Sequence, residues 1–487
     1  MTQAPQSNDA LVPGATPFDS QPPAAGDPHA REQIRDLVAA QGTVVIVLDD
    51  DPTGSQVVHD VPILTSWDER SLDWALSQGT AMVFILTNTR SLSPAKVETL
   101  LREAMQAVDL AAQRAGRPYV VACRGDSTLR GHFPLETDVV SSVLAAHGHP
   151  VDGVLLVPAY IEAGRVTVDG IQYANVSGHY LPVSETDYAR DATFGFRSAR
   201  LSEYVEERTG GRIPARDVVG IRLTDLRVGG PAAVAQLLSL VSHGGVAVCD
   251  ALTREDLDTL VLGLLEAEAK GKRFVYRAGP SFVAARVGME GTEPVRPPAP
   301  PPGRHGLVVV GSHVELTGRQ LDRLRQLPDI KTVELNVPDL LDPAGRQART
   351  NEASQRAVEA LATSDVLLVT SRERIEGRSP EESLAIARLV SEVLVGVVRQ
   401  VHDRVDLGWV IAKGGITSHD VAVSGLGIRR AVVAGQLFPG MTSVWISVAE
   451  GDEAAPSNMP YVVFAGNVGD DSSMADAVQI LRGGRRA

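Results

Sequence analysis

The feature that most constrains the fold is a short apolar run that ends in three carboxylates. Residues 44–48 are all Val, Ile or Leu, and Asp49, Asp50 and Asp51 follow them directly, before a Pro-Thr-Gly turn at 52–54. Such a run is typical of a strand buried on both faces, as in the parallel sheet of an α/β domain. The acids then lie at the carboxyl end of the strand, where open α/β sheets bind ligands.

Three adjacent carboxylates repel one another unless a cation, basic side chains or hydroxyl donors share their site. An acidic turn in solvent is the alternative for this motif taken alone. Two later strands, predicted at 82–87 and 119–122, are followed by groups that can serve as partners. These groups are Asn88 and Arg90 after the first, and Arg124, Asp126, Ser127 and Arg130 after the second.

The carboxyl ends of parallel strands emerge on one edge of a sheet, so we expect these three loops to lie together. Arginine forks can hold a small carboxylate, and aspartates can accept hydrogen bonds from several hydroxyls. The combination predicts a site for a polyhydroxy acid. Each loop alone is also compatible with a capping turn or a surface ion pair.

Strands, polar loops and helices alternate along most of the chain, which is the pattern of parallel sheets covered by helices. A proline-rich segment at 297–302 interrupts this pattern and is typical of a stiff linker. We therefore predict an α/β protein with two domains, each a mainly parallel sheet. The expected boundaries are 1–28 for a disordered tail, 29–292 for the first domain, 293–304 for the linker and 305–487 for the second domain.

The second domain contains several glycine-rich loops after predicted strands. Lys413, Gly414, Gly415 and Thr417 follow a strand predicted at 409–412 and precede a helix predicted to begin near Asp420. Glycines let backbone N–H groups approach phosphate oxygens, and a helix N-terminus favours anions. No GxxxxGK[ST] loop is present, and each glycine pair alone could be a simple turn. Together they favour nucleotide binding, and the remaining candidates are Gly311, Ser312, Gly425, Gly427, Gly466, Asn467 and Gly469.

Composition limits the classes of molecule that the protein is expected to bind. A net charge of −14 argues against nucleic acid or an anionic membrane as the main partner. The sequence shows neither a signal peptide nor an uninterrupted apolar stretch of the roughly 20 residues that a spanning helix needs, so we expect a cytoplasmic protein. The two cysteines, Cys123 and Cys249, are expected to be buried thiols, and the absence of a Cys/His cluster argues against structural zinc.

Three motifs occur in a fixed order: the acidic motif at 49–54, Arg-Gly-Asp-Ser-Thr-Leu-Arg-Gly at 124–131 and Lys-Gly-Gly-Ile-Thr-Ser at 413–418. In these motifs, over roughly residues 42–482, the chain resembles the four-carbon acid sugar kinases. The resemblance implies a sugar-acid-binding N-terminal domain, a nucleotide-binding C-terminal domain and an active site in the cleft between them. It also implies ATP- and Mg²⁺-dependent phosphorylation of a terminal hydroxyl of a threonate, erythronate or 3-oxo-tetronate type acid, and a homodimer.

The chain departs from the family pattern in two places. Many members have Ala-Asp-Asp where this chain has three aspartates, and many have an acidic residue at the position of Ile416. We interpret both as marks of a subgroup whose acid is branched or oxidised.

In the resulting hypothesis Arg90, Arg124 or Arg130 holds the substrate carboxylate, and aspartates hold its hydroxyls. Asp126 is the first candidate for the general base and Asp50 the second. The metal ligands are left open. Two rival interpretations are a metal-dependent sugar-acid dehydratase or aldolase without ATP, and a sugar-acid-binding regulator without chemistry.

Overall fold

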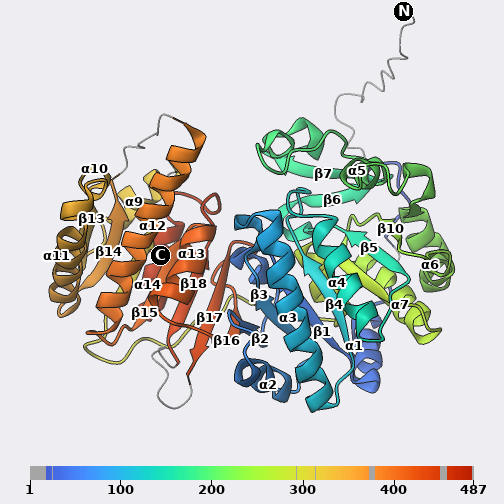
Figure 1. Ribbon diagram of the computed structural model, residues 1–487, viewed down its shortest axis with the longest axis horizontal. Helices are drawn as coiled ribbons and strands as arrows, with labels where there is room; N and C mark the ends of the chain where they lie inside the picture. Colours follow the sequence, from blue (N-terminus) through green and yellow to red (C-terminus); the bar gives the residue numbers. More distant parts are fainter. Residues whose placement is uncertain are drawn as a thin grey trace, which may run out of the picture. The chain divides into compact units, whose positions relative to one another are not determined.

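The computed structural model describes residues 18–24, 26–291, 293–312, 314–371, 379–449 and 458–484 (Figure 1). Its packing divides the chain into two compact units. Unit 1 comprises residues 1–41 and 125–289, and unit 2 comprises residues 42–124 and 290–487. Both units combine sheets with covering helices, so the predicted α/β class is confirmed.

The division differs from a single cut at the proline-rich linker, because residues 42–124 pack with the C-terminal half. The reason is a long-range strand pair that no local pattern announces. Strand β2 (Val61–Leu64) is antiparallel to β16 (Arg430–Gly435), with Val61 opposite Val433 and Leu64 opposite Arg430. The two units do not test the predicted boundaries of the sugar-acid-binding and nucleotide-binding domains, which remain a prediction.

Unit 2 contains strands in the order β13-β14-β12-β15-β18-β17-β16-β2-β3-β1-β4. Neighbours are parallel except around β16 and β17, whose pairs β2–β16, β16–β17 and β17–β18 are antiparallel. The other bounds are β1 (Val44–Asp49), β3 (Met82–Leu86), β4 (Tyr119–Arg124), β12 (Gly306–Val310), β13 (Ile330–Leu335), β14 (Asp365–Thr370), β15 (Trp409–Lys413), β17 (Thr442–Val448) and β18 (Pro460–Phe464).

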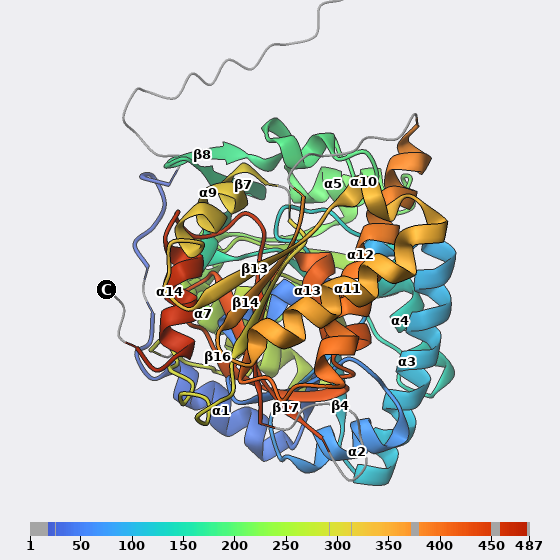
Figure 2. The same cartoon turned by 90° about the vertical axis from the view of Figure 1, so that its left-hand side faces the viewer.

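Helices cover both faces of this sheet. Figure 2 shows α9 (Glu315–Leu324) and α14 (Ser473–Leu481) on one side of β13 and β14, with α11 (Pro343–Leu361) and α12 (Pro380–His402) on the other. The apolar core of the first side joins these strands to both of its helices. The remaining helices of unit 2 are α2 (Glu69–Ser77), α3 (Pro94–Ala115), α10 (Val337–Leu340) and α13 (Gly415–Asp420).

Local sequence explains where helix α3 begins and ends. Pro94 occupies the first turn of α3, and Gly116 ends it at φ 62°, a left-handed conformation that glycine adopts without strain. Between them Val97, Leu101 and Val108 recur on the buried face.

Unit 1 contains a parallel sheet in the order β11 (Phe274–Ala278), β5 (Gly153–Val157), β10 (Gly245–Cys249) and β9 (Val219–Ile221). A separate antiparallel sheet, β6 (Arg165–Val168), β7 (Ile171–Val176) and β8 (His179–Pro182), was not predicted. Its strands are short, and β8 is largely outside the core, so they lack the continuous apolar runs of the main sheet. The helices of unit 1 are α1 (Ala30–Gln41), α4 (Leu135–Ala146), α5 (Leu201–Arg208), α6 (Gly230–Ser239), α7 (Arg254–Ala269) and α8 (Pro280–Arg286).

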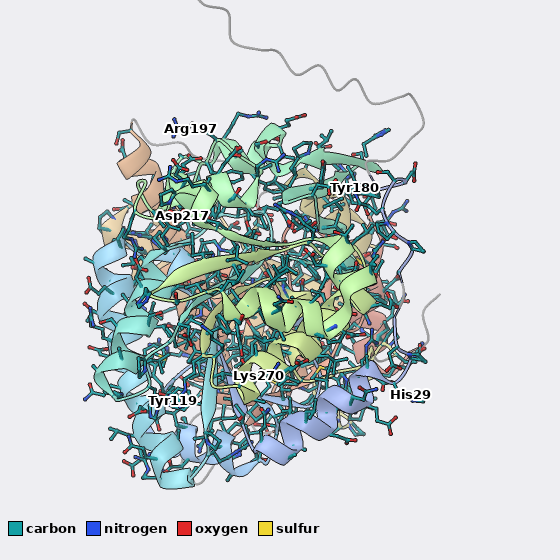
Figure 3. All side chains as sticks on the ribbon, turned by 90° about the vertical axis from the view of Figure 1, so that its right-hand side faces the viewer. His29, Tyr119, Tyr180, Arg197, Asp217 and Lys270 are labelled. Atoms are coloured by element: carbon teal, nitrogen blue, oxygen red, sulfur yellow. The ribbon has the colours of Figure 1, made fainter. Side chains whose placement is uncertain are left out.

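Part of the expected disordered tail packs on unit 1. In Figure 3 this segment runs from the region of Tyr180 on β8 to His29, just before α1. The Phe18 ring makes T-shaped contacts with Tyr173 and Tyr180 at centroid distances of 5.7 and 4.8 Å, which the composition of the tail does not predict. Residues 1–17 and 25 lie outside the described residues.

Both cysteines are buried free thiols, as expected. None of the described helices is long and apolar enough to cross a membrane.

Candidate functional site

The carboxyl ends of β1, β3 and β4 meet on one edge of the unit 2 sheet. Both neighbours of β1 are parallel to it, with Asp49 opposite Leu86 of β3 and opposite Arg124 of β4. Asn88 follows β3 in a left-handed conformation, and its N–H donates to the carbonyl of Asp49. The structure therefore brings together Asp49, Asp50, Asp51, Asn88, Arg90 and Arg124, which the sequence placed at three strand ends.

The arginines of this acidic cluster are already paired with its carboxylates. Arg90 donates to Asp50 through two atoms, Nε to Oδ2 at 3.1 Å and Nη2 to Oδ1 at 2.6 Å. Nη2 of Arg124 lies 2.6 Å from Oδ1 of Asp49, and its Nη1 lies 3.5 Å from Oδ1 of Asp50. The side chains of Asp49, Asp50 and Arg124 are 0%, 1% and 4% exposed, so these are buried charges that neutralise one another.

The environments of Asp49 and Asp51 move their pKa values apart. Burial raises the pKa of Asp49 to about 7, although Arg124 opposes this shift. Burial also acts on Asp51, but the charges of Arg90 and Arg124 and the hydrogen bonds from Thr53 outweigh it and lower the pKa of this carboxyl. Oδ2 of Asp49 is buried and has no hydrogen-bond partner among the described residues.

The turn after the acids is anchored on both sides. A Cβ atom at Gly54 would lie 1.7 Å from Nη2 of Arg124, so only glycine fits where this guanidinium crosses the turn. Oγ of Ser55 lies 2.9 Å from Oγ of Ser443 on β17, and Nε2 of Gln56 donates to the carbonyl of Met441 at 3.0 Å. The acidic loop is therefore attached to a strand of the C-terminal half.

Three of the glycine-rich loops also converge within unit 2. A Cβ atom at Gly311 would lie 2.2 Å from Oγ1 of Thr417, and one at Gly466 would lie 3.0 Å from Oγ of Ser312. Gly414 adopts φ 112°, and its Cβ position lies 3.6 Å from Cβ of Ser312. The backbone of each of these glycines therefore packs closely against a side chain of a neighbouring loop, at the ends of β12, β15 and β18.

Lys413, at the end of β15, points into the protein. The residue is 0% exposed. Its Nζ donates to the carbonyls of Ala465 at 2.9 Å and Val468 at 3.5 Å, and lies 4.0 Å from the centroid of the Phe464 ring. Burial lowers the pKa of this ammonium to about 7.

The helix predicted to begin near Asp420 in fact ends there. Helix α13 begins at Gly415, so Thr417 lies inside its first turns. Propensity favoured a loop over the glycines, but Ser418 donates its N–H to the Gly414 carbonyl and closes the first helical turn. Sequence reasoning gave too much weight to glycine as a helix breaker.

The other predicted glycines lie apart from the converging loops or at their margin. Gly425 ends the π-helical turn Val421–Gly425, and its Cβ position lies 3.0 Å from Val398 of α12. Gly427 follows at φ 66°. Asn467 is exposed, and the Cβ position of Gly469 lies 2.7 Å from Oγ of Ser473 at the start of α14.

The acidic loop and the glycine loop of α13 lie against each other within unit 2. A Cβ atom at Gly415 would lie 3.0 Å from Oδ2 of Asp51. Burial lowers the pKa of His419 on the same helix, while the charges of Asp420 and Asp51 oppose that shift. Motifs separated by more than three hundred residues of sequence thus form one local arrangement.

Unit 1 contains the second aspartate motif. Nε of Arg130 donates to Oδ2 of Asp126 at 2.6 Å, and the Thr128 hydroxyl donates to the same oxygen. The Thr128 N–H approaches Oδ1 at 3.3 Å. The carbonyl of Ser127 accepts a hydrogen bond from Gln172 at 2.8 Å. The placement of Asp126, Ser127 and Arg130 beside the acidic cluster remains a prediction.

Sequence reasoning missed several partners of these motifs. Nη1 of Arg130 lies 3.6 Å from Asp191, and its guanidinium lies 5.0 Å from the ring centroid of Tyr188. Thr317 and Gln320 of α9 donate to carbonyls of the loop after β18. These residues stand in helices and turns without a motif, so only the packing identifies them.

The described ranges contain no group of three or more His, Cys, Asp or Glu side chains arranged to hold a metal ion. A Mg²⁺ ion that bridges nucleotide phosphates needs only one or two protein carboxylates. Asp51, with its lowered pKa and a side chain that is 19% exposed, is a carboxylate of this kind. The residues present therefore fit a metal that arrives with the nucleotide.

Comparisons with known protein families identify two domains in the chain. Residues 45–286 match the family described as a sugar-binding N-terminal domain, and residues 307–474 match the family described as a nucleotide-binding C-terminal domain. No curated protein sequence matches the chain.

Two solved structures share the fold. A protein of Salmonella typhimurium LT2, described as a proposed tRNA synthase, is 17% identical with a TM-score of 0.65, over 90% of this chain and 98% of that one. The Haemophilus influenzae protein HI1011, of the family DUF1537, is 18% identical with a TM-score of 0.62, over 90% of this chain and 100% of that one. Since the two matched domains are those of a single family, the chain belongs to the four-carbon acid sugar kinase family.

Proposed function

We propose that this protein transfers the γ-phosphoryl group of ATP to a terminal hydroxyl of a four-carbon sugar acid of the threonate, erythronate or 3-oxo-tetronate type, or of a branched relative. The observation that supports this most directly is the approach of Asp51 to Gly415. It joins the acidic loop of the matched sugar-binding domain to a glycine loop of the matched nucleotide-binding domain.

The substrate carboxylate would be held by arginine. Arg90 and Arg124 are oriented by Asp50 and Asp49, so Asp50 acts in this proposal by fixing two guanidinium groups. Arg130 is the more accessible candidate, since its side chain is 27% exposed. A guanidinium fork matches a carboxylate through two parallel hydrogen bonds.

Asp126 is the proposed general base. Its Oδ2 accepts hydrogen bonds from Arg130 and Thr128, and its Oδ1 accepts one from the Thr128 N–H at 3.3 Å. A carboxylate oxygen can accept more than one hydrogen bond, so in this proposal Asp126 accepts the proton of the attacking hydroxyl. In the proposed step that hydroxyl oxygen forms a bond to the γ-phosphorus, the bond from phosphorus to the β–γ bridging oxygen breaks, and ADP leaves.

The nucleotide would bind at the converging loops around Gly311, Gly414 and Gly466, where backbone N–H groups can meet phosphate oxygens. Mg²⁺, when bound, neutralises charge on the phosphates. Asp51 is the proposed protein group beside it. The predicted cleft and the homodimer belong to this proposal.

ADP release tests the proposal. The purified full-length protein is given Mg-ATP with D- or L-threonate, D- or L-erythronate, 3-oxo-tetronates or branched 3-oxo acids, and ADP is measured with and without each acid. We expect ADP with one class of acid only. ADP-free conversion of an acid would support a dehydratase or aldolase, and binding of an acid without any turnover would support a regulator.

A further inference from the structure

The loop after β18 is held by its carbonyl groups. Three side chains reach them from beneath: Lys413 donates to Ala465 O at 2.9 Å, Thr317 to Gly466 O at 3.1 Å, and Gln320 to Val468 O at 3.1 Å. Gln320 also donates to Asp470 O at 2.8 Å. The carbonyls of Ala465, Gly466, Val468 and Asp470 are therefore turned toward the protein interior.

Peptide geometry fixes where the corresponding N–H groups point. In a trans peptide the N–H of each residue lies opposite the carbonyl of the residue before it. The carbonyls of Ala465, Gly466 and Val468 face inward, so the N–H groups of Gly466, Asn467 and Gly469 face the other way. In the part of the chain that the structure describes, these three N–H groups donate no hydrogen bond. Several free N–H groups on one face of a loop form a concavity for an anion.

Lys413 supplies charge under this loop. Its polar partners among the described residues are the carbonyls of Ala465 and Val468, and no carboxylate pairs with it there. A buried cation without a counter-ion lowers the stability of a fold. Burial accordingly lowers its pKa to about 7, so an approaching anion would favour its charged form. Groups with strongly shifted pKa values cluster at functional sites.

We propose that Lys413 is the positioning residue of a phosphate-binding loop and acts through the carbonyls that it holds. The N–H groups of Gly466, Asn467 and Gly469 then contact the nucleotide phosphates. This assignment rests on the proposed function, and it replaces the expectation that Lys413 binds the nucleotide directly. Gln320, which no motif identified, shares the same task through Val468 and Asp470.

Calorimetric binding of Mg-ATP and of adenosine to the full chain tests the assignment. The variants are Lys413→Met and Gln320→Met, with Lys272→Met as a control. Lys272 also donates to a carbonyl, that of Val241 at 2.6 Å, but it is paired with Asp152 in unit 1. We expect both loop variants to weaken Mg-ATP binding by about tenfold, or about 1.4 kcal/mol. Adenosine binding should be unchanged, because adenosine has no phosphate.

Stability separates this role from a purely structural one. Lys413→Met removes an unneutralised buried charge, so its free energy of unfolding should equal or exceed that of the wild type, whereas Lys272→Met should lower it. Wild-type binding of Mg-ATP by both loop variants would overturn the assignment while leaving the kinase proposal intact. A loss in Lys413→Met alone would make Lys413 a direct phosphate ligand and also overturn it. Failure of the wild type to bind Mg-ATP would refute the proposed function itself.

Discussion

The two aspartate–arginine motifs use the same residue types in different ways. In unit 2, Asp49, Asp50 and Arg124 are almost fully buried, and Arg124 pairs with both carboxylates. In unit 1, Asp126 and Arg130 are only partly exposed, at 13% and 27%, and the hydroxyl and the N–H of Thr128 also donate to the carboxylate. The buried cluster holds its own side chains in fixed positions, because buried charged groups have little freedom to exchange partners. The partly exposed pair can exchange a partner for a substrate at lower cost than the buried cluster.

The largest effect is expected from the exposed motif. Asp126→Asn keeps the size of the side chain but removes the base, so turnover should fall by about 10²- to 10⁴-fold while the fold is retained. Steady-state ADP release and thermal unfolding measure the two properties. The matched control is Asp191→Asn, which alters the other acidic neighbour of Arg130 at 3.6 Å and should reduce turnover much less. Near-normal turnover in Asp126→Asn would remove the base from this motif.

The buried cluster should respond mainly in stability. Arg124→Met leaves Asp49 and Asp50 without a shared cation in the interior, and we expect a loss of about 3–5 kcal/mol in the free energy of unfolding. Arg130→Met, in the exposed motif, should cost about 1 kcal/mol or less. Urea denaturation of both variants checks the contrast. Equal losses would show that burial does not distinguish the two motifs.

The smallest expected effect concerns pH. The folded-state pKa of Asp49 is raised to about 7, so between about pH 4 and 7 the folded protein binds a proton that the unfolded chain has lost. The contribution of this group to stability therefore falls as pH rises through that window, by about 2 kcal/mol between about pH 5 and 7. Asp49→Asn should lack this fall.

Asp51→Asn is the matched control, because the pKa of Asp51 is lowered. Its contribution is present above the ordinary carboxyl pKa and is lost as pH falls, which is the opposite sign. Urea denaturation at several pH values gives both curves. If the wild type and Asp49→Asn changed in parallel, the carboxyl of Asp49 would not titrate in this range.

Much of the fold was accessible to sequence reasoning where the signal is local. The strands predicted at 44–48, 82–87 and 409–412 consist mainly of apolar runs, and the structure contains them within one residue of the predicted ends. The sheet β6–β8 and strands β2 and β16 were missed, because β2 has only four residues and β7 and β16 mix buried with partly exposed residues. The start of α13 was misplaced because its first turn contains glycine, which has a low helix propensity. Tertiary contacts stabilise the helical turn there.

In the candidate site, too, the residue types could be predicted from local sequence, whereas the contacts between distant segments could not. The polar residues at the strand ends and the glycines of the converging loops could be identified from the sequence alone. Buried strands appear there as apolar runs, and tight turns appear as glycines. The pairing of Asp50 with Arg90, the approach of Asp51 to Gly415 and the inward direction of Lys413 could not be identified in this way. They depend on side chains from distant segments that share one dense interior, where each charge takes the partner that packing brings within reach.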